Sequence, residues 1–395
     1  MALITLERNA EAERARASAL PSLTGLRFAA ALAVFAYHLT LPQFTPFGGV
    51  VAKQAGWLFG LSGWVGVSFF FVLSGFVLTW SARPGDTPRR FVRRRLAKLF
   101  PNHLATFAVA MVLFAATTST WRQWLPNLLL VQAWFPDPTV SFSVNVPSWS
   151  LACELLFYLC FPVLHRWIGR IDPAHLWRWA AGVTALVLAV PVVAYAVLPG
   201  GSSVPGLPVS VVQNWFVYQF PPVRMLEFVL GVLMARVVLT GRWVGITLPY
   251  AFGLLAVGYA IALRVPYLYG LSAACVIPVA LLVPAAAVAD VRGLPSVFRS
   301  RVMTWLGEVS FAWYLVQGIV FIYSVQLLAG HKPYSLPVGI AVSLLFTAVV
   351  LVAAKVLHVA VERPSMKLWS GSRGPAPQRD RSKKGAVAVA AARRP

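Results

Sequence analysis

Long apolar runs constrain the fold of this 395-residue chain more than any other feature. A helix needs about 20 consecutive apolar residues to cross a bilayer. Ten such runs lie at approximately 24–42, 62–82, 99–118, 149–168, 176–198, 219–240, 244–263, 268–290, 304–329 and 336–361. Charged residues make up only 12% of the chain, about half their usual share in soluble domains. We therefore predict an all-α, polytopic integral membrane protein with about ten transmembrane helices.

The basic residues are distributed unevenly among the predicted loops. With the N-terminus placed in the cytoplasm, the cytoplasmic segments carry 27 of the 34 Lys and Arg residues, and the outer loops carry 4. Cytoplasmic loops of membrane proteins are enriched in Lys and Arg, so both termini are predicted to be cytoplasmic. The net charge of +22 is therefore better explained by membrane orientation than by nucleic-acid binding.

The remaining segments are predicted from their composition. Residues 1–21 form a cytoplasmic segment without a secretory signal, residues 22–368 the membrane domain, and residues 369–395 a disordered basic tail. The Trp-rich stretch 121–135 is predicted to be an interfacial loop, because an arginine and a proline interrupt it. The three cysteines lie in apolar runs without metal-ligand spacing, which predicts small buried side chains: Cys153, Cys160 and Cys275.

Ionisable residues inside predicted spans are candidates for a functional site, because each is costly unless it is paired or hydrated. They are Arg27, His38, Glu154, Arg224, Glu227, Glu308, Lys355 and His358. The predicted helix directions place His38, Glu154, Arg224 and Glu227 toward the outer side, and Arg27 near the cytoplasm.

Arg27 and His38 are eleven residues apart in the first predicted helix. Eleven steps of 100° return to nearly the same face, and the rise along the axis is about 16 Å. A cation and a deeper imidazole on one face suit a long, thin substrate with an anionic end, such as an acyl group on a pantetheine arm. The alternative is that Arg27 extends to the lipid headgroups and His38 makes a polar contact at the outer interface.

Three further groups of polar residues have both a functional and a structural interpretation. Arg90, Arg93, Arg94 and Lys98 fit the phosphates of a soluble cofactor, or else lipid phosphates. Glu154 is predicted to lie at the depth of His38 and to orient its imidazole. Arg224 and Glu227, at i and i+3, fit a site or simply neutralise each other. Ser74 and Gly75 allow close helix approach.

The order and spacing of seven motifs give the chain a recognisable pattern from about residue 22 to 368. The motifs are GLRFAAALAVFAYH (25–38), FFFVLSGFVLTW (69–80), RRRLAKLFP (93–101), PSWSLACE (147–154), RMLEF (224–228), LGEVSFAWYLVQ (306–317) and VERP (361–364). In these motifs the chain resembles the acyltransferase 3 family of integral-membrane O-acyltransferases.

The resemblance implies transfer of an acyl group, often acetyl, from acyl-CoA to a hydroxyl of a carbohydrate or glycosylated natural product. It implies no permanently bound cofactor and a plasma-membrane location. The family's essential histidine and its arginine fall on His38 and Arg27, and the donor-associated basic stretch falls on Arg90 to Lys98. The expected catalytic residues are His38, Glu154 and Arg224. Substrate binding is expected at Ser148, Trp149, Ser150 and Glu227.

One position departs from the family pattern, since many relatives have histidine where this chain has Gln317. Glutamine forms hydrogen bonds but carries no proton at neutral pH, so we assign it no catalytic role. The sequence leaves open whether His38 acts as a base or forms an acyl-histidine. It also leaves open whether the acceptor comes from outside or, like a macrolide, from the cytoplasm. The competing function is a multispan transporter or flippase that exports a glycan or small metabolite.

Overall fold

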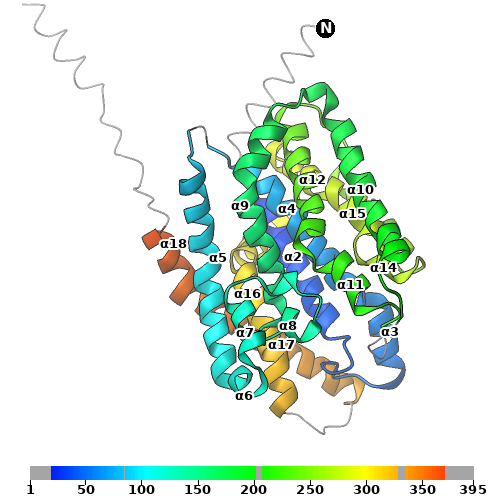
Figure 1. The fold of residues 1–395 in the computed structure, drawn as a ribbon, viewed down its shortest axis with the longest axis vertical. Coiled ribbons are helices and arrows are strands. Elements are labelled where there is room, and N and C mark those ends of the chain that lie inside the picture. Colours follow the sequence, from blue (N-terminus) through cyan, green and yellow to red (C-terminus); the bar gives the residue numbers. More distant parts are fainter. Residues whose placement is uncertain (1–18, 84, 202–206, 328–333, 370–395) are drawn as a thin grey trace, which may run out of the picture.

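The computed structural model describes residues 19–83, 85–201, 207–327 and 334–369 (Figure 1). Regular structure in these ranges is helical, and the only strand-like pairing in them is an isolated bridge between Phe47 and Tyr334. This confirms the all-α prediction. Most of the predicted N-terminal segment and basic tail lies outside the described residues.

Ten helices correspond to the predicted spans. They are α2 (Pro21–His38), α4 (Ser62–Trp80), α5 (Pro88–Ala110), α9 (Trp149–Gly169), α10 (Leu176–Val197), α12 (Pro221–Leu239), α13 (Leu248–Ala262), α15 (Ala273–Val291), α16 (Arg301–Leu327) and α17 (Leu336–Leu357). Shorter helices connect them: α3 (Gly49–Phe59), α6 (Ala116–Thr118), α7 (Trp121–Leu128), α8 (Pro138–Ser141), α11 (Val211–Tyr218), α14 (Tyr267–Leu271) and α18 (Arg363–Trp369).

Short 3₁₀ and π segments complete the chain. The 3₁₀ turns are η2 (Gln132–Trp134), η3 (Val146–Ser148), η4 (Pro173–His175) and η5 (Val297–Arg299), and the π segments are η1 (Met111–Ala115) and η6 (His358–Glu362). The π segments extend α5 and α17, respectively.

Seven helical stretches of the described chain are long and apolar enough to cross a membrane. They are Gly49–Trp80, Pro88–Thr118, Val146–Gly169, Pro173–Val197, Tyr267–Val291, Arg301–Ser324 and Leu336–Leu368. The other three predicted spans are α2, α12 and α13. The first two carry ionisable residues, and α13 has only 15 residues. The chain is thus a helical membrane protein, while the count of ten and the orientation stay predictions.

The segment 121–135, which was predicted to be an interfacial loop, contains regular structure but no helix long enough to cross a membrane. Trp121–Leu128 forms α7, and Gln132–Trp134 forms a 3₁₀ turn. A capping box starts α7, in which the Gln123 side chain accepts a hydrogen bond from the backbone N–H of Thr120 at 2.8 Å. Such a cap satisfies donors at the helix start, which favours helix even in a stretch that contains a proline.

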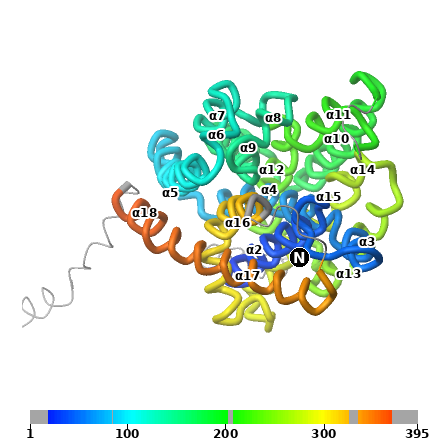
Figure 2. The backbone as a smooth tube through the Cα atoms, turned by 90° about the horizontal axis from the view of Figure 1, so that it is seen from below, coloured from blue at the N-terminus to red at the C-terminus, as the bar shows by residue number. Residues whose placement is uncertain are grey.

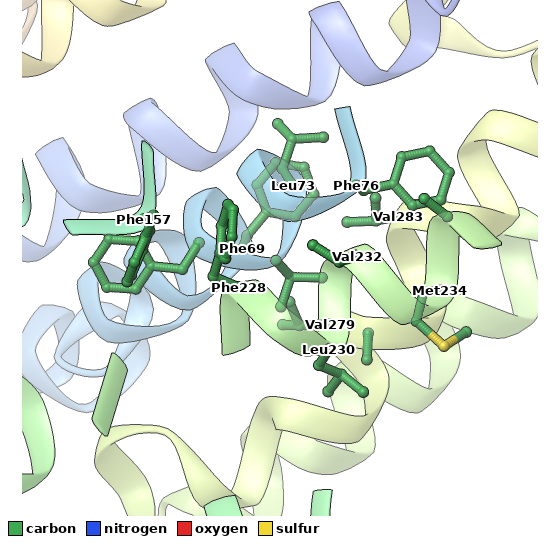
Figure 3. Close-up of a cluster of buried hydrophobic side chains, with 14 of the residues drawn as sticks. Phe69, Leu73, Phe76, Phe157, Phe228, Leu230, Val232, Met234, Val279 and Val283 are labelled. Carbon is green, nitrogen blue, oxygen red and sulfur yellow. The ribbon is translucent and has the colours of Figure 1, made fainter. Parts of the chain in front are cut away.

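The helices α2, α4 and α16 lie near the centre of the bundle when it is seen end-on, and α17 lies at its edge (Figure 2). Large apolar side chains from α4, α9, α12 and α15 interlock in the main core (Figure 3). Among them are Phe69, Phe76, Phe157, Phe228 and Val283. The central helices therefore have neighbours on most sides, and this arrangement positions the polar residues described below.

Two glycines bring the backbones of α4 and α12 into contact. A Cβ atom on Gly75 would lie 2.0 Å from the carbonyl oxygen of Phe228, and one on Gly231 would lie 2.0 Å from that of Val72. The prediction that Gly75 allows close helix approach is confirmed. The obstructing atoms belong to backbone, which cannot move aside as a flexible side chain can.

We expect Gly75→Ala or Gly231→Ala to force α4 and α12 apart and to lower stability by about 1–3 kcal/mol or more. Thermal unfolding of purified protein in detergent measures the change. The matched control is Gly253→Ala in α13, where nothing lies within 4 Å of the added Cβ atom. Equal melting temperatures for all three variants would contradict the close contact.

Candidate active site

A cavity of about 390 Å³ lies between α2, α4, α5, α9 and α16. Its lining follows helical spacing, as on α9, where Ser150, Glu154 and Tyr158 succeed one another at four-residue intervals. The cavity begins beside Ala19 at the start of α2 and Trp80 at the end of α4. This is the end of the bundle that the distribution of Lys and Arg predicts to be cytoplasmic.

Basic side chains dominate the polar part of the cavity. Arg27, Arg95 and Lys98 line it, together with the single carboxylate of Glu154. Arg27 is the strongest charged neighbour of Lys98. The Tyr158 hydroxyl donates a hydrogen bond of 2.7 Å to Glu154 Oε2. Three cations against one carboxylate make the cavity suited to an anionic ligand.

The predicted cluster of Arg90, Arg93, Arg94 and Lys98 does not form one surface. Only Lys98 lines the cavity, while Arg90 and Arg93 are exposed. Arg94 forms an ion pair with Asp86 in the loop before α5. The Arg94 guanidinium holds the pKa of the Asp86 carboxyl below its usual value, so this pair is charged at neutral pH.

Among the cavity residues that the sequence did not single out, three have titratable side chains: Arg95, Tyr158 and Tyr314. Arg95 stands in the predicted basic run, three positions before Lys98, and a spacing of three puts both on one face of α5. Tyr158 follows Glu154 by four positions, which is the same kind of signal. Tyr314 lies inside the quoted motif LGEVSFAWYLVQ. Extending the stripes of Lys98 and Glu154 by one turn would have found Arg95 and Tyr158.

His38 is buried and does not belong to the cavity lining. Its ring centroid lies 5.7 Å from that of Phe321 and 6.5 Å from that of Phe44. The side chain of Gln317 is its polar neighbour. Its Nδ1 atom has no hydrogen-bond partner within the described ranges. One nitrogen of this buried imidazole therefore lacks a polar contact among the described residues.

The predicted contact between Glu154 and His38 is not observed within the described part of the chain. The hydrogen-bonding and charged neighbours of Glu154 are Tyr158 together with Lys98, Arg27 and Arg95. Glu154 faces α5, whereas His38 faces α16, so similar depth along two helices did not bring these side chains together. The expected orienting role of Glu154 has no geometric support.

Arg224 and Glu227 form the ion pair that the sequence allowed as the structural alternative. The Arg224 Nη2 to Glu227 Oε2 distance is 2.9 Å, and both side chains are almost completely buried. The Ser68 hydroxyl donates to Glu227 at 2.9 Å and accepts from Arg224 at 3.1 Å. The guanidinium also lies 5.0 Å from the ring centroid of Phe71, which lines the cavity. The pair therefore joins α12 to α4 behind the cavity wall.

In the predicted substrate-binding segment Ser148–Ser150, the first two residues make contacts within the protein, and only the third lines the cavity. Ser148 Oγ accepts hydrogen bonds from Asn127 at 3.0 Å and Gln132 at 3.1 Å, all in buried positions. Trp149 packs edge-to-face against Phe71. Ser150 lines the cavity, and its Oγ lies 2.9 Å from the Tyr314 hydroxyl oxygen.

No group of three or more His, Cys, Asp or Glu residues that could hold a metal ion occurs in the described part of the chain. The three cysteines are free thiols, and Cys153 and Cys275 are buried. The candidate site thus has two parts, the cationic cavity and His38, which is buried apart from it. Helix α2 contributes residues to both.

Comparison with known proteins gives one family and several relatives. Residues 20–356 match the family described as acyltransferase domain, acyltransferase 3. The acyltransferase MdmB of Streptomyces mycarofaciens is 44% identical over 360 residues, which cover 88% of this chain and 92% of that protein.

Other relatives match over shorter ranges. The peptidoglycan O-acetyltransferase OatA of Listeria monocytogenes is 30% identical over 175 residues, which cover 38% of this chain and 25% of that protein. The exopolysaccharide production protein ExoZ of Rhizobium meliloti is 30% identical over 198 residues, covering 48% of this chain and 56% of that protein. No solved structure matches the chain.

Replacing Arg224 with methionine leaves the buried Glu227 carboxylate without its cation, and we expect a loss of about 3–5 kcal/mol in stability. The double variant Arg224→Met/Glu227→Leu removes both charges and should recover most of that loss. Thermal unfolding in detergent measures both, with the exposed Arg264→Met as control. A double variant no more stable than Arg224→Met alone would show that the ion pair is not the source of the effect.

Proposed function

We propose that this chain, which belongs to the acyltransferase 3 family, transfers an acyl group from acyl-CoA to a hydroxyl group at the plasma membrane. The donor group is acetyl, and the acceptor is a carbohydrate or a glycosylated natural product. The observation that carries the proposal is the cationic cavity beside the helix that also bears His38.

The donor end of the cavity suits the phosphates of CoA. Arg27, Arg95 and Lys98 line it, and guanidinium and ammonium groups form strong, charge-assisted hydrogen bonds with phosphate oxygens. The exposed Arg90 and Arg93 add positive charge to the same end of α5 and attract the anionic donor. Glu154 limits the mutual repulsion of these cations, so we assign it to the donor side rather than to His38.

His38 is the residue that we assign to the transfer itself. It accepts the proton of the acceptor hydroxyl as the oxygen attacks the thioester carbonyl carbon. A C–O bond forms, the C–S bond breaks, and the proton passes to the departing thiolate to give the free thiol of CoA. Within the described part of the chain Nδ1 has no hydrogen-bond partner, and this nitrogen together with the aromatic surroundings of the ring suits a base that works away from bulk water.

In this proposal the other predicted site residues hold the cavity wall and the segment before α9 in place. Arg224 and Glu227 hold Phe71 from behind, and Trp149 packs against the same ring, so all three support the cavity wall. Ser148 fixes the segment before α9 through its amide partners. Of the residues predicted to bind substrate, Ser150 alone reaches the cavity.

The names of two relatives support the acceptor class. OatA is a peptidoglycan O-acetyltransferase, and ExoZ is an exopolysaccharide production protein. Both names refer to carbohydrate polymers, and the first names transfer of acetyl to oxygen. A hydroxyl on a sugar is therefore the acceptor that we propose for this chain as well.

We expect His38→Ala and His38→Gln to lose about 10²–10⁴-fold in acyl transfer, the usual contribution of a general base. The assay follows radiolabelled acetyl-CoA with purified protein in nanodiscs, measuring free CoA and label on the protein. His175→Ala, an exposed histidine in a 3₁₀ turn, is the matched control. Full turnover by a correctly folded His38→Ala would exclude the role of His38, and label retained on wild type alone would indicate an acyl-histidine.

Neutralising the cavity should weaken donor binding. Arg95→Gln or Lys98→Gln removes a charged partner of phosphate, which is worth roughly a tenfold to hundredfold change in affinity. Equilibrium binding of acetyl-CoA measures the effect, and Arg170→Gln, an exposed arginine at the end of α9, serves as control. Absence of any acyl-CoA binding by wild type would favour the transporter function instead.

A further inference from the structure

The buried imidazole of His38 faces the helix α16. The ring centroids of His38 and Phe321 of α16 lie 5.7 Å apart. Gln317 stands one turn before Phe321 on the same face of this helix, and its side chain is the polar neighbour of His38. Gln317 and Phe321 are 0% and 1% exposed. A glutamine amide therefore lies beside the residue that we assign to the transfer, out of contact with solvent.

The amide of Gln317 has a fixed orientation. Its Nε2 donates a hydrogen bond of 3.3 Å to the backbone carbonyl oxygen of Tyr314. Turning the amide over would place Oε1 against that carbonyl oxygen, and both of these atoms can only accept. In the present orientation Oε1 is buried and has no hydrogen-bond partner within the described ranges. The oxygen is therefore the end of this amide that is left for the imidazole.

This oxygen decides which ring nitrogen of His38 carries the proton. A neutral imidazole has one N–H donor and one acceptor nitrogen. Nδ1 of His38 is buried without a partner among the described residues. A buried N–H without a partner is costly and rare in proteins, and an unused lone pair is tolerated more often. The proton therefore belongs on Nε2, for which Gln317 Oε1 is the available acceptor.

We propose that Gln317 is a positioning residue, which holds the neutral imidazole of His38 as the Nε2–H tautomer and leaves the Nδ1 lone pair to act as the base. The catalytic part of this inference deepens the proposed function and rests on it. When Nδ1 takes up the proton of the acceptor hydroxyl, the ring becomes positively charged, and its hydrogen bond to the amide oxygen strengthens. Gln317 supplies this acceptor without adding a second buried charge, and it exchanges no proton itself.

Nitrogen NMR of protein labelled at its histidines, in nanodiscs, measures the tautomer directly. The chain has six histidines, and the signals of His38 are those missing from His38→Gln. At about pH 8.5, where histidine is ordinarily neutral, we expect the Nε2–H tautomer in wild type and both tautomers in Gln317→Met. Methionine keeps the length of the side chain and removes the amide. Gln219→Met changes another buried glutamine with an unpaired Oε1 and should leave the signals of His38 unchanged.

Transfer kinetics measure the consequence for the reaction. We expect Gln317→Met to slow acetyl transfer about 10- to 100-fold, which corresponds to one hydrogen bond to a charged group. Its affinity for acetyl-CoA should be unchanged, because the cavity lining is intact. Gln317→His returns an acceptor nitrogen and should recover part of the rate. The assay follows the release of free CoA from radiolabelled acetyl-CoA in nanodiscs, and Gln219→Met should react as wild type does.

The outcomes separate this inference from the proposed function. The wild-type tautomer in Gln317→Met, or an Nδ1–H tautomer in wild type, would overturn the inference whatever the activity of the enzyme. If wild type neither binds nor converts acetyl-CoA, the proposed function fails and the catalytic role of Gln317 with it, while the tautomer result stands by itself. A fall in donor affinity as large as the fall in rate would contradict the positioning role. Should Gln317→Met not fold, Gln317→Leu takes its place in both measurements.

Discussion

A charged side chain inside an apolar bundle costs several kcal/mol unless it is paired or hydrated, and this cost accounts for where the charges of this protein lie. Arg224 and Glu227 satisfy each other within one helix. Asp290 of α15 accepts hydrogen bonds from the backbone and side chain of Ser22, at the start of α2. Arg27, Arg95 and Lys98 lie around the cavity. Arg236 of α12 instead donates to the backbone carbonyl oxygens of Ile168 and Ile171. Partners within the protein thus account for several buried charges, and three cations are left to a candidate site.

The helix α4 connects packing with the site. Its Gly75 lets the backbone of α12 approach, while its neighbour Ser74 faces the cavity from the other side of the same turn. One turn earlier, Phe70 and Phe71 line the cavity as well. Any change in the distance between α4 and α12 is therefore also a change in the shape of the cavity.

Contacts between residues close together on one helix can be predicted from the sequence, whereas contacts between different helices cannot. The ion pair of Arg224 and Glu227 was foreseeable because residues three apart on a helix are neighbours whatever surrounds them. Whether Glu154 contacts His38 could not be predicted, because this contact depends on how α9 and α2 are rotated about their own axes. The apolar pattern of these two helices predicts the depth of a residue in the membrane. It does not predict which neighbouring helix that residue faces.

The basic run on α5 illustrates the same limit. Successive residues of a helix point about 100° apart, so Arg94 and Arg95 face different surroundings despite being adjacent. Arg94 pairs with Asp86, whereas Arg95 lines the cavity. The number of basic residues in the run indicated an anion site, and only the packing of α5 against α9 and α16 decides which of them form it.

The single helix α2 carries both Arg27 and His38, and a helix is a rod of fixed rise. Their Cα atoms are held about 16 Å apart along the helix axis, whatever the loops around them do. In the proposed reaction the fixed length of α2 therefore sets the length that the donor must have. An acyl phosphate or other compact activated acyl group that binds at Arg27 leaves its carbonyl carbon far from His38. In that reaction, a donor with a long spacer between its anionic end and its acyl group spans the distance, so the length of one helix favours such a donor over a compact one.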